Sequence, residues 1–192
     1  MPPLLVVVAG PSGSGKSTYF PVRDFGIGSF NVDDRCAELN GGSYRAIPER
    51  VRRQAQDECE RFVADSIASR RSFAIETTLR TLIAVEQAGR ARAVGFETCL
   101  VYVSTDDVEA NVLRVARRAL DGGHSAPIER IREIYASSLS NLARALPMFD
   151  EVLLYDSSIH AAMPRLVRRY ARGVIASDFP PSPRWLAAAE PP

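Results

Sequence analysis

The residues best suited to chemistry form a stretch of eight near the N-terminus. The stretch has the spacing G-x-x-x-x-G-K-[ST] and consists of Gly10, Pro11, Ser12, Gly13, Ser14, Gly15, Lys16 and Ser17, followed by Thr18. Glycines let backbone amides approach the phosphates of a nucleotide, the lysine reaches the β- and γ-phosphates, and the last hydroxyl ligates Mg²⁺. Lys16 is also the only lysine in the chain. The pattern predicts a loop that binds ATP or GTP together with Mg²⁺, and a chance glycine-rich loop is the alternative.

A second polar group, Asn31, Asp33 and Asp34, follows the next apolar segment. A carboxylate there can accept the proton of a hydroxyl that attacks the γ-phosphate, and Asp33 is our preferred candidate for this base. Asn31 and Asp34 are candidates for binding the acceptor. The alternative is a helix N-cap followed by first-turn acids, which accounts for one carboxylate without requiring both.

A third polar group, Glu76, Thr77 and Thr78, follows another apolar segment. A glutamate at a strand end can bind sugar hydroxyls or act on Mg²⁺ through water, and the threonines can bind phosphates. We therefore assign all three to the acceptor site. Capping of the next helix is the alternative role for either threonine, but this role suits Glu76 poorly.

Arginines cluster on either side of a glycine-rich turn that contains Gly122, Gly123 and His124; they are Arg114, Arg117, Arg118, Arg130 and Arg132. Two helices joined by such a turn resemble a lid over phosphates, and the planar guanidinium binds phosphate oxygens in pairs. We assign Arg114 and Arg117 to catalysis and Arg132 to the nucleotide. A solvated basic face is the alternative for some of the five. His124 can contact a phosphate or the acceptor, and a surface histidine is the competing interpretation.

Apolar runs alternate with stretches of helical periodicity along the chain. Strands are predicted at 4–9, 25–32, 73–75, 98–103 and 152–155, and helices at 49–71, 82–93, 104–120 and 128–146, with a last helix that reaches residue 173. This alternation predicts an α/β fold whose parallel sheet has helices on both faces. Polar clusters at 10–17, 31–34, 76–78, 104–107 and 156–158 each follow a strand. Because parallel strands end at one edge, these clusters are expected to share one site.

The length of 192 residues suits one domain, which we place at residues 1–175. Residues 176–192 are rich in proline and alanine and are expected to be loosely ordered, with Trp185 and Leu186 as a short anchor.

The composition is that of a soluble globular protein, with 46% hydrophobic and 24% charged residues. A net charge of +1 argues against bulk electrostatic binding to nucleic acid or to a membrane surface. Three widely spaced cysteines and the lack of a signal-peptide pattern favour reduced thiols in the cytoplasm.

Several short motifs in fixed order resemble the zeta-toxin family of P-loop kinases, in particular its shorter branch. The motifs are Ala9 to Thr18, Asn31-Val32-Asp33, Glu76-Thr77-Thr78-Leu79, Arg114-Val115-Ala116-Arg117, Gly122 to Pro127, Asn141-Leu142 and Tyr155-Asp156-Ser157-Ser158. The resemblance covers about residues 4–172. It implies a P-loop fold with a helical lid and Mg²⁺-dependent phosphorylation of a sugar hydroxyl by ATP or GTP. In toxin members of the family the acceptor is UDP-N-acetylglucosamine.

The resemblance also implies roles for individual residues. Asp33 takes the place of the catalytic aspartate, Glu76 that of the acidic acceptor-binding strand end, and Arg114 with Arg132 that of the nucleotide-side arginines. A neutralising antitoxin is the protein partner that a toxin of this family implies.

Two other functions remain open from the sequence. One is a kinase for a nucleoside, an antibiotic or another metabolite on the same fold. The other is a nucleotide-dependent switch that acts on a protein partner. The second is weakened because Asp156 is the only candidate for the metal-binding acid that follows an apolar strand in such proteins.

Overall fold

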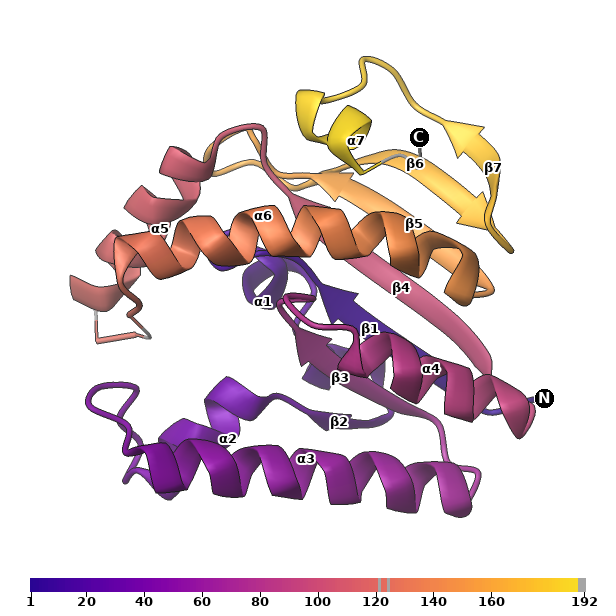
Figure 1. The fold of residues 1–192 in the computed structure, drawn as a ribbon, viewed down its shortest axis with the longest axis horizontal. Coiled ribbons are helices and arrows are strands. Elements are labelled where there is room, and N and C mark those ends of the chain that lie inside the picture. Colours follow the sequence, from indigo (N-terminus) through magenta and orange to yellow (C-terminus); the bar gives the residue numbers. More distant parts are fainter. Residues whose placement is uncertain (121, 124, 190–192) are drawn as a thin grey trace.

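The computed structural model describes residues 1–189 except Asp121 and His124. Its strands are β1 (Leu4–Ala9), β2 (Gly28–Phe30), β3 (Phe73–Thr77), β4 (Glu97–Ser104), β5 (Glu151–Asp156), β6 (Arg165–Ala171) and β7 (Val174–Asp178). Its α-helices are α1 (Lys16–Tyr19), α2 (Val32–Leu39), α3 (Glu49–Ala68), α4 (Ile83–Ala93), α5 (Val108–Leu120), α6 (Ile128–Ala145) and α7 (Arg184–Ala188). Two short 3₁₀ turns, η1 (Val22–Phe25) and η2 (Leu146–Met148), complete the fold (Figure 1).

The strands of the described residues form one seven-stranded sheet with the order β2-β3-β1-β4-β5-β6-β7. The first five strands in this order are parallel, as predicted. Their carboxyl ends therefore meet at one edge, where the polar clusters of the sequence come together. In the sheet, β1 lies between β3 and β4. The chain passes from β1 to β2 and β3 on one side and then to β4 on the other side. The order of the strands therefore reverses at β1, which is where a ligand is expected to bind.

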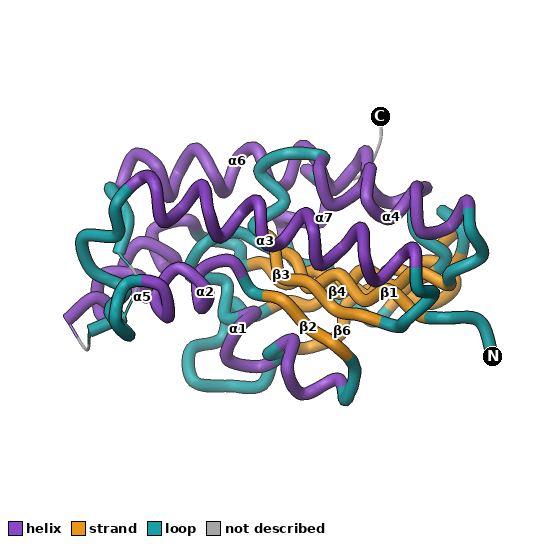
Figure 2. Tube along the Cα trace, turned by 90° about the horizontal axis from the view of Figure 1, so that it is seen from below, coloured by secondary structure: helices purple, strands orange, loops and turns teal. Residues whose placement is uncertain are grey.

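The two faces of the sheet are covered unequally (Figure 2). On one face, α3, α4, α6 and α7 pack against inward-pointing residues such as Leu5 and Phe73 and form a continuous core. On the other face, Val6 and Val8 meet only the short segment that contains α1 and η1, through residues such as Val22. The prediction of helices on both faces is confirmed, and one of the two layers is thin.

Helices α5 and α6 form the helical lid of the fold. They pack against each other through Val112, Val115 and Ile131, which make a small apolar cluster of their own. Farther along α6, Leu139 and Leu142 belong to the main core. The lid is thus anchored to the sheet at one end and reaches over its carboxyl edge at the other (Figure 1).

The C-terminal part of the chain differs from the sequence expectation. A helix was expected up to Gly173, but residues 165–171 form β6, which pairs antiparallel with β5. Gly173 has φ +76° and turns the chain into β7, so the expected boundary at residue 175 falls inside a strand. Alternation of exposed and buried residues along β6 is the reason, because it suits a half-buried strand better than a helix.

The segment that follows β7 is also ordered rather than loose. Trp185 and Leu186 in α7 are buried at 3% and 2% exposure, which confirms them as an anchor. The Trp185 ring lies against that of Tyr102 in the main core, with ring centroids 5.9 Å apart. Trp185, Leu186 and Ala189 therefore belong to the same core as the rest of the domain.

None of the helices in the described residues is long and apolar enough to cross a membrane. The three cysteines are free thiols, as expected from their spacing.

Candidate active site

The glycine-rich loop is fixed by close backbone contacts at two of its glycines. Gly10 has φ +143°, and a Cβ atom there would lie 2.1 Å from the carbonyl oxygen of Val103 in β4. Gly13 has φ +81°, and a Cβ there would lie 2.5 Å from the carbonyl oxygen of Asn111 in α5. Only glycine fits both positions, so the loop is held between β4 and the lid.

Helix α1 starts at Lys16, with Gly15 as its N-cap, and spans only four residues. The first backbone amides of a helix have no acceptor inside it and are free to bind an anion. So short a helix has a small macrodipole, and anion binding must depend on these amides and on the Lys16 ammonium. Ser12, Ser14 and Ser17 lie along this loop, and Pro11 is buried at its start.

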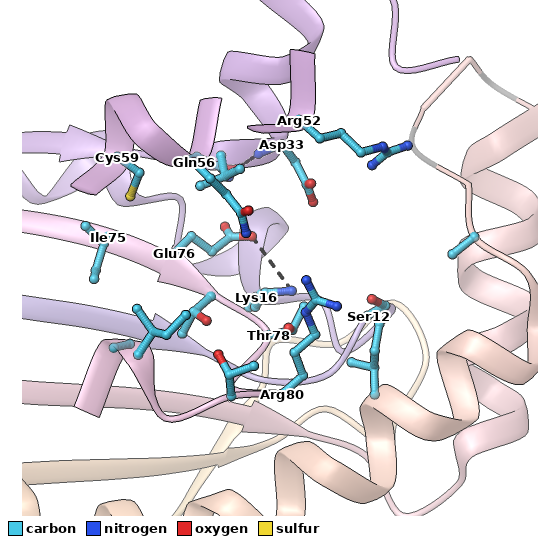
Figure 3. Close-up of a pocket in the computed structure, with 18 of the residues that line it drawn as sticks. Ser12, Lys16, Asp33, Arg52, Gln56, Cys59, Ile75, Glu76, Thr78 and Arg80 are labelled. Atoms are coloured by element: carbon cyan, nitrogen blue, oxygen red, sulfur yellow. Dashed lines mark hydrogen bonds and ion pairs between the residues drawn. The ribbon is translucent and has the colours of Figure 1, made fainter. Parts of the chain in front are cut away.

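Glu76 connects the lysine and the last serine of the loop. Ser17 Oγ donates a hydrogen bond to Glu76 Oε1 at 2.8 Å, and Lys16 Nζ lies 3.7 Å from the same oxygen (Figure 3). Glu76 Oε2 is buried and has no hydrogen-bond partner among the described residues. A buried carboxylate oxygen without a donor suits a cation or its bound water.

Ser17 and Glu76 therefore fit Mg²⁺ at the ends of the neighbouring strands β1 and β3. The described residues contain no cluster of three acidic, histidine or cysteine side chains. This agrees with the way nucleotide-bound Mg²⁺ is usually held, by one or two protein groups together with phosphates. Asp156, the acid considered from the sequence, instead accepts hydrogen bonds from Ser158 Oγ and Trp185 Nε1.

The two neighbouring aspartates at the start of α2 face different surroundings. Asn31 is the N-cap of this helix, and its Oδ1 accepts from the amides of Asp33 at 2.9 Å and Asp34 at 3.3 Å. Asp34 accepts a hydrogen bond from Tyr44 Oη at 2.8 Å, and this bond raises the pKa of Tyr44 to about 12. Asp33 lines the cavity next to the P-loop and points into it (Figure 3). The geometry thus favours Asp33 over Asp34 for chemistry. Asn31 caps α2 and also lines the cavity.

The cavity beside the loop has a volume of about 470 Å³. Its walls come from the loop, the start of α2, α3, the end of β3, α4 and the lid. Lys16, Glu76 and Thr78 line it from the carboxyl edge, and Arg52 and Gln56 line it from α3 (Figure 3). A volume of this size suits a small-molecule ligand.

An unusual turn directs the residues after β3 into this cavity. Leu79 is fully buried and has φ +56°, a left-handed conformation that is rare for leucine. Its amide donates to Thr77 Oγ1, and its carbonyl oxygen accepts from Asn141 Nδ2 of α6 at 3.0 Å. These bonds hold a turn that brings Thr78 and Arg80 to the cavity wall, while Thr77 supports the turn.

Arg114 of the lid contacts the backbone of the loop. Its Nη1 lies 3.4 Å from the carbonyl oxygen of Gly13, and its Nη2 donates to the carbonyl oxygen of Ser157 at 2.7 Å. Ser157 Oγ in turn donates to the carbonyl oxygen of Ser14. Arg114 therefore joins the lid, the P-loop and the segment after β5.

The other arginines of the lid separate into different roles. Arg132 makes two hydrogen bonds to Glu109, at 2.9 and 3.1 Å, on the exposed side of the lid. Arg117 is exposed and is not among the residues that line the cavity. Arg130, which we did not assign to the site, does line it. His124 lies outside the described residues, and Thr18 is exposed at the end of the loop.

Sequence reasoning therefore missed several residues of the cavity wall, namely Arg52, Gln56, Arg80, Gln87 and Arg130. Arg80 directly follows the motif Glu76 to Leu79, and this adjacency was the one signal in the sequence. The others lie on helices among residues of helical periodicity, where nothing distinguishes a wall residue from a surface residue.

Neither a family model nor a curated protein matches the sequence. Solved structures do match. A chain of the PezAT chromosomal toxin-antitoxin system of Streptococcus pneumoniae has a TM-score of 0.59 at 21% identity, over 81% of this chain and 68% of that one. A chain of the AvrRxo1-ORF1:AvrRxo1-ORF2 structure has a TM-score of 0.69 at 17% identity, over 91% and 60%. A candidate kinase from Chloroflexus aurantiacus has a TM-score of 0.62 at 18% identity, over 85% and 94%.

These identities show the fold and not the reaction. Since the chain spans 68% and 60% of the first two proteins, their activities and partners carry over only as proposals. The chain shares with these structures an α/β fold with a mostly parallel sheet, which is the fold that the motif resemblance implied.

Proposed function

We propose that this protein is an ATP- or GTP-dependent kinase that transfers the γ-phosphate to a hydroxyl group of a small molecule. One observation carries the proposal: Lys16 of the P-loop and the carboxylate of Asp33 line the same cavity of about 470 Å³. A phosphate-binding group and a base that share a cavity of this size are what phosphoryl transfer to a small acceptor requires.

In the proposed reaction, the acceptor hydroxyl oxygen attacks the γ-phosphorus while the bond to the β,γ-bridging oxygen breaks. Asp33 takes the hydroxyl proton, and the nucleoside diphosphate leaves with the bridging oxygen. Lys16 offsets the charge on the phosphates. Ser17 and Glu76 would hold Mg²⁺, Glu76 directly or through water, and the ion would supply positive charge to the phosphates. Arg114 keeps the loop in place through Gly13.

We propose a sugar hydroxyl as the acceptor group, with UDP-N-acetylglucosamine or a related amino sugar as the first candidate. The motif resemblance to the zeta-toxin family supports this choice. So does the polar wall of the cavity, where Glu76 and Thr78 can bind hydroxyl groups.

A different metabolite is the second candidate for the acceptor. Arg52, Arg80 and Arg130 all line the cavity, and this favours a substrate that carries phosphate or carboxylate. A sugar nucleotide and a phosphorylated or carboxylated metabolite both meet this condition.

We further propose a protein antitoxin as a partner and the cytoplasm as the location. The PezAT structure comes from a toxin-antitoxin system, which supports the partner proposal. Free thiols and the use of ATP or GTP support the cytoplasm.

The test is mass spectrometry of a panel of acceptors incubated with the protein, Mg²⁺ and ATP or GTP. The panel contains UDP-N-acetylglucosamine, free amino sugars, nucleosides and small carboxylated or phosphorylated alcohols. We expect one acceptor to gain a single phosphate, and Asp33→Ala to remove the product while nucleotide binding persists.

Hydrolysis of nucleotide with no phosphorylated acceptor would overturn the kinase proposal. It would favour the nucleotide-dependent switch, above all if a protein partner changed the hydrolysis rate. Asp34→Ala is the matched control, because it removes the neighbouring carboxylate, which is bonded to Tyr44.

A further inference from the structure

The cavity next to the P-loop has two chemically different ends. At the end near the loop, Lys16, Arg52 and Arg80 carry charge (Figure 3). At the opposite end, Cys59 and Ile75 form an uncharged wall (Figure 3). Burial raises the pKa of the Cys59 thiol to about 11, so this group is neutral at physiological pH.

Helix α4 contributes a buried amide to this cavity. Gln87 lines the cavity one helical turn after Ile83, the first residue of α4. The helix runs from the carboxyl edge back toward the amino ends of the strands (Figure 1), and Gln87 is one turn farther along it than Ile83.

The side chain of Gln87 has no hydrogen-bond partner in the described part of the chain, although the residue is only 4% exposed. Four side-chain atoms of the described residues have neither exposed surface nor a hydrogen-bond partner, namely Ser14 Oγ, Glu76 Oε2, Ser104 Oγ and Asn111 Nδ2. The Gln87 amide is not among them, and the surface that it keeps is therefore accessible from the cavity.

A buried amide without a partner is costly, and most buried polar groups avoid this state. Tyr102 and Ser138 illustrate the usual outcome, because their hydroxyl groups bond to each other at 2.9 Å in the buried core. A group that stays unpaired and faces a ligand cavity is explained if the ligand supplies the partner.

We propose that Gln87 determines acceptor specificity by pairing with a neutral amide-type group on the part of the acceptor that lies away from the reacting hydroxyl. Such a group offers a carbonyl oxygen beside an N–H, which matches the donor and acceptor of the Gln87 amide. An anionic group is disfavoured beside Cys59 and Ile75 because these uncharged side chains offer it no counter-charge. The inference rests on the proposed kinase function. An acetamido group of an amino sugar and the lactam edge of a nucleobase share the required chemistry.

The first experiment compares wild type with Gln87→Met, which keeps the side-chain length and removes the amide. The acceptors are UDP-N-acetylglucosamine, UDP-glucose and free N-acetylglucosamine, each with ATP and Mg²⁺. If the acetamido group is bound, kcat/KM for the two acetylated acceptors falls about tenfold in the variant, and UDP-glucose is unaffected. If the nucleobase is bound, both UDP-sugars lose about tenfold and free N-acetylglucosamine does not. Equal kcat/KM values for the two proteins on every acceptor would overturn the inference.

Binding without turnover separates this inference from the proposed function. If wild type phosphorylates none of the three acceptors, the same compounds are tested for binding by ligand-observed NMR. Binding that is weaker in Gln87→Met supports the role of Gln87 even though the kinase proposal fails for these acceptors. Binding that is absent in wild type, or equal in both proteins, overturns the inference.

Thermal unfolding of the ligand-free proteins tests for a purely structural role. Because the amide has no protein partner to lose, we expect the Tm of Gln87→Met to equal or exceed that of wild type. A clear fall in Tm would show that the amide holds the fold and would overturn the inference. Gln54→Met is the control, because Gln54 is exposed on α3, donates to Glu58 and lies outside this cavity. Gln54→Met should have the same kcat/KM as wild type for each of the three acceptors.

Discussion

The nucleotide side and the acceptor side of the site are built in opposite ways. On the nucleotide side, one continuous loop is held by its own backbone, and Gly10 and Gly13 lie against carbonyl oxygens of β4 and α5 with no room for a side chain. On the acceptor side, the cavity wall comes from separate elements, and side chains such as Arg80 and Gln87 line it. Phosphate binding is thus fixed by main-chain geometry, and acceptor choice by exchangeable side chains.

This difference predicts which substitutions can change acceptor specificity. A new side chain at Gly10 or Gly13 would displace backbone, so the loop cannot vary without losing its shape. A new side chain at Gln87 changes one wall of a cavity and leaves the loop intact. We expect variants of the two sides to separate loss of catalysis from change of acceptor.

The largest effect is expected for Lys16→Ala, which removes the ammonium group of the loop. Loss of one charge-stabilising group of this kind lowers kcat by about 10³-fold. Steady-state kinetics with saturating acceptor measures it. Lys16→Arg is the companion variant, since it keeps the charge but changes its shape, and partial activity is expected. Undiminished turnover in Lys16→Ala would remove the P-loop from the mechanism.

The next effect is expected for Asp33→Asn, which removes the base and keeps the size of the side chain. Removal of a general base lowers kcat by about 10²–10³-fold, while nucleotide affinity should hold. In the matched variant Asp34→Asn, kcat should stay near that of wild type because Asp34 is bonded to Tyr44 and lies outside the cavity. Equal losses of kcat in the two variants would contradict the assignment of the base to Asp33 and not to Asp34.

The sequence was a good guide to the nucleotide side for a physical reason. A loop that relies on its own backbone needs specific residues at consecutive positions, and such a pattern is visible in one short stretch. Strands β1, β3 and β4 were equally visible, because buried strands are continuously apolar. The strand expected at 25–32 is only Gly28–Phe30 in the structure, because this edge strand is short and has no buried residue. Asp33 and Glu76 could be placed at the same edge because parallel strands end together.

The acceptor side was less visible because its residues are dispersed. Arg52 and Gln87 lie about 35 positions apart on two helices, and only their packing brings them to one cavity. Arg132 was assigned to the nucleotide, yet it bonds to Glu109, because helical periodicity does not say which exposed arginine faces the site. The C-terminal strands were missed for a similar reason, since the alternation along β6 is incomplete, with Val167 and Arg168 both buried.

Arg114→Ala tests whether the contact between the lid and the P-loop holds the nucleotide side in place. Hydrogen bonds from a charged group contribute about 1.5–3 kcal/mol, and this variant removes the donors to Gly13 and Ser157. If Arg114 positions the loop, the ligand-free protein loses stability and nucleotide affinity falls as well. Chemical unfolding and nucleotide titration measure the two effects. If affinity falls while stability without nucleotide is unchanged, Arg114 acts as a phosphate ligand only.

The smallest effect is expected from Tyr44→Phe, because Tyr44 and its partner Asp34 both lie outside the cavity. In the folded protein the bond to Asp34 raises the pKa of Tyr44 to about 12, above the ordinary value of about 10. The stabilisation is therefore complete below pH 10 and is lost as the pH rises through 12. Wild type should exceed the variant by about 1 kcal/mol in unfolding free energy at pH 8, and the difference should shrink toward pH 12. A difference that stays constant over this range would mean that the tyrosine ring, and not its hydrogen bond, secures the start of α2. Catalysis at neutral pH should change little, because Asp33 keeps its place through the Asn31 cap.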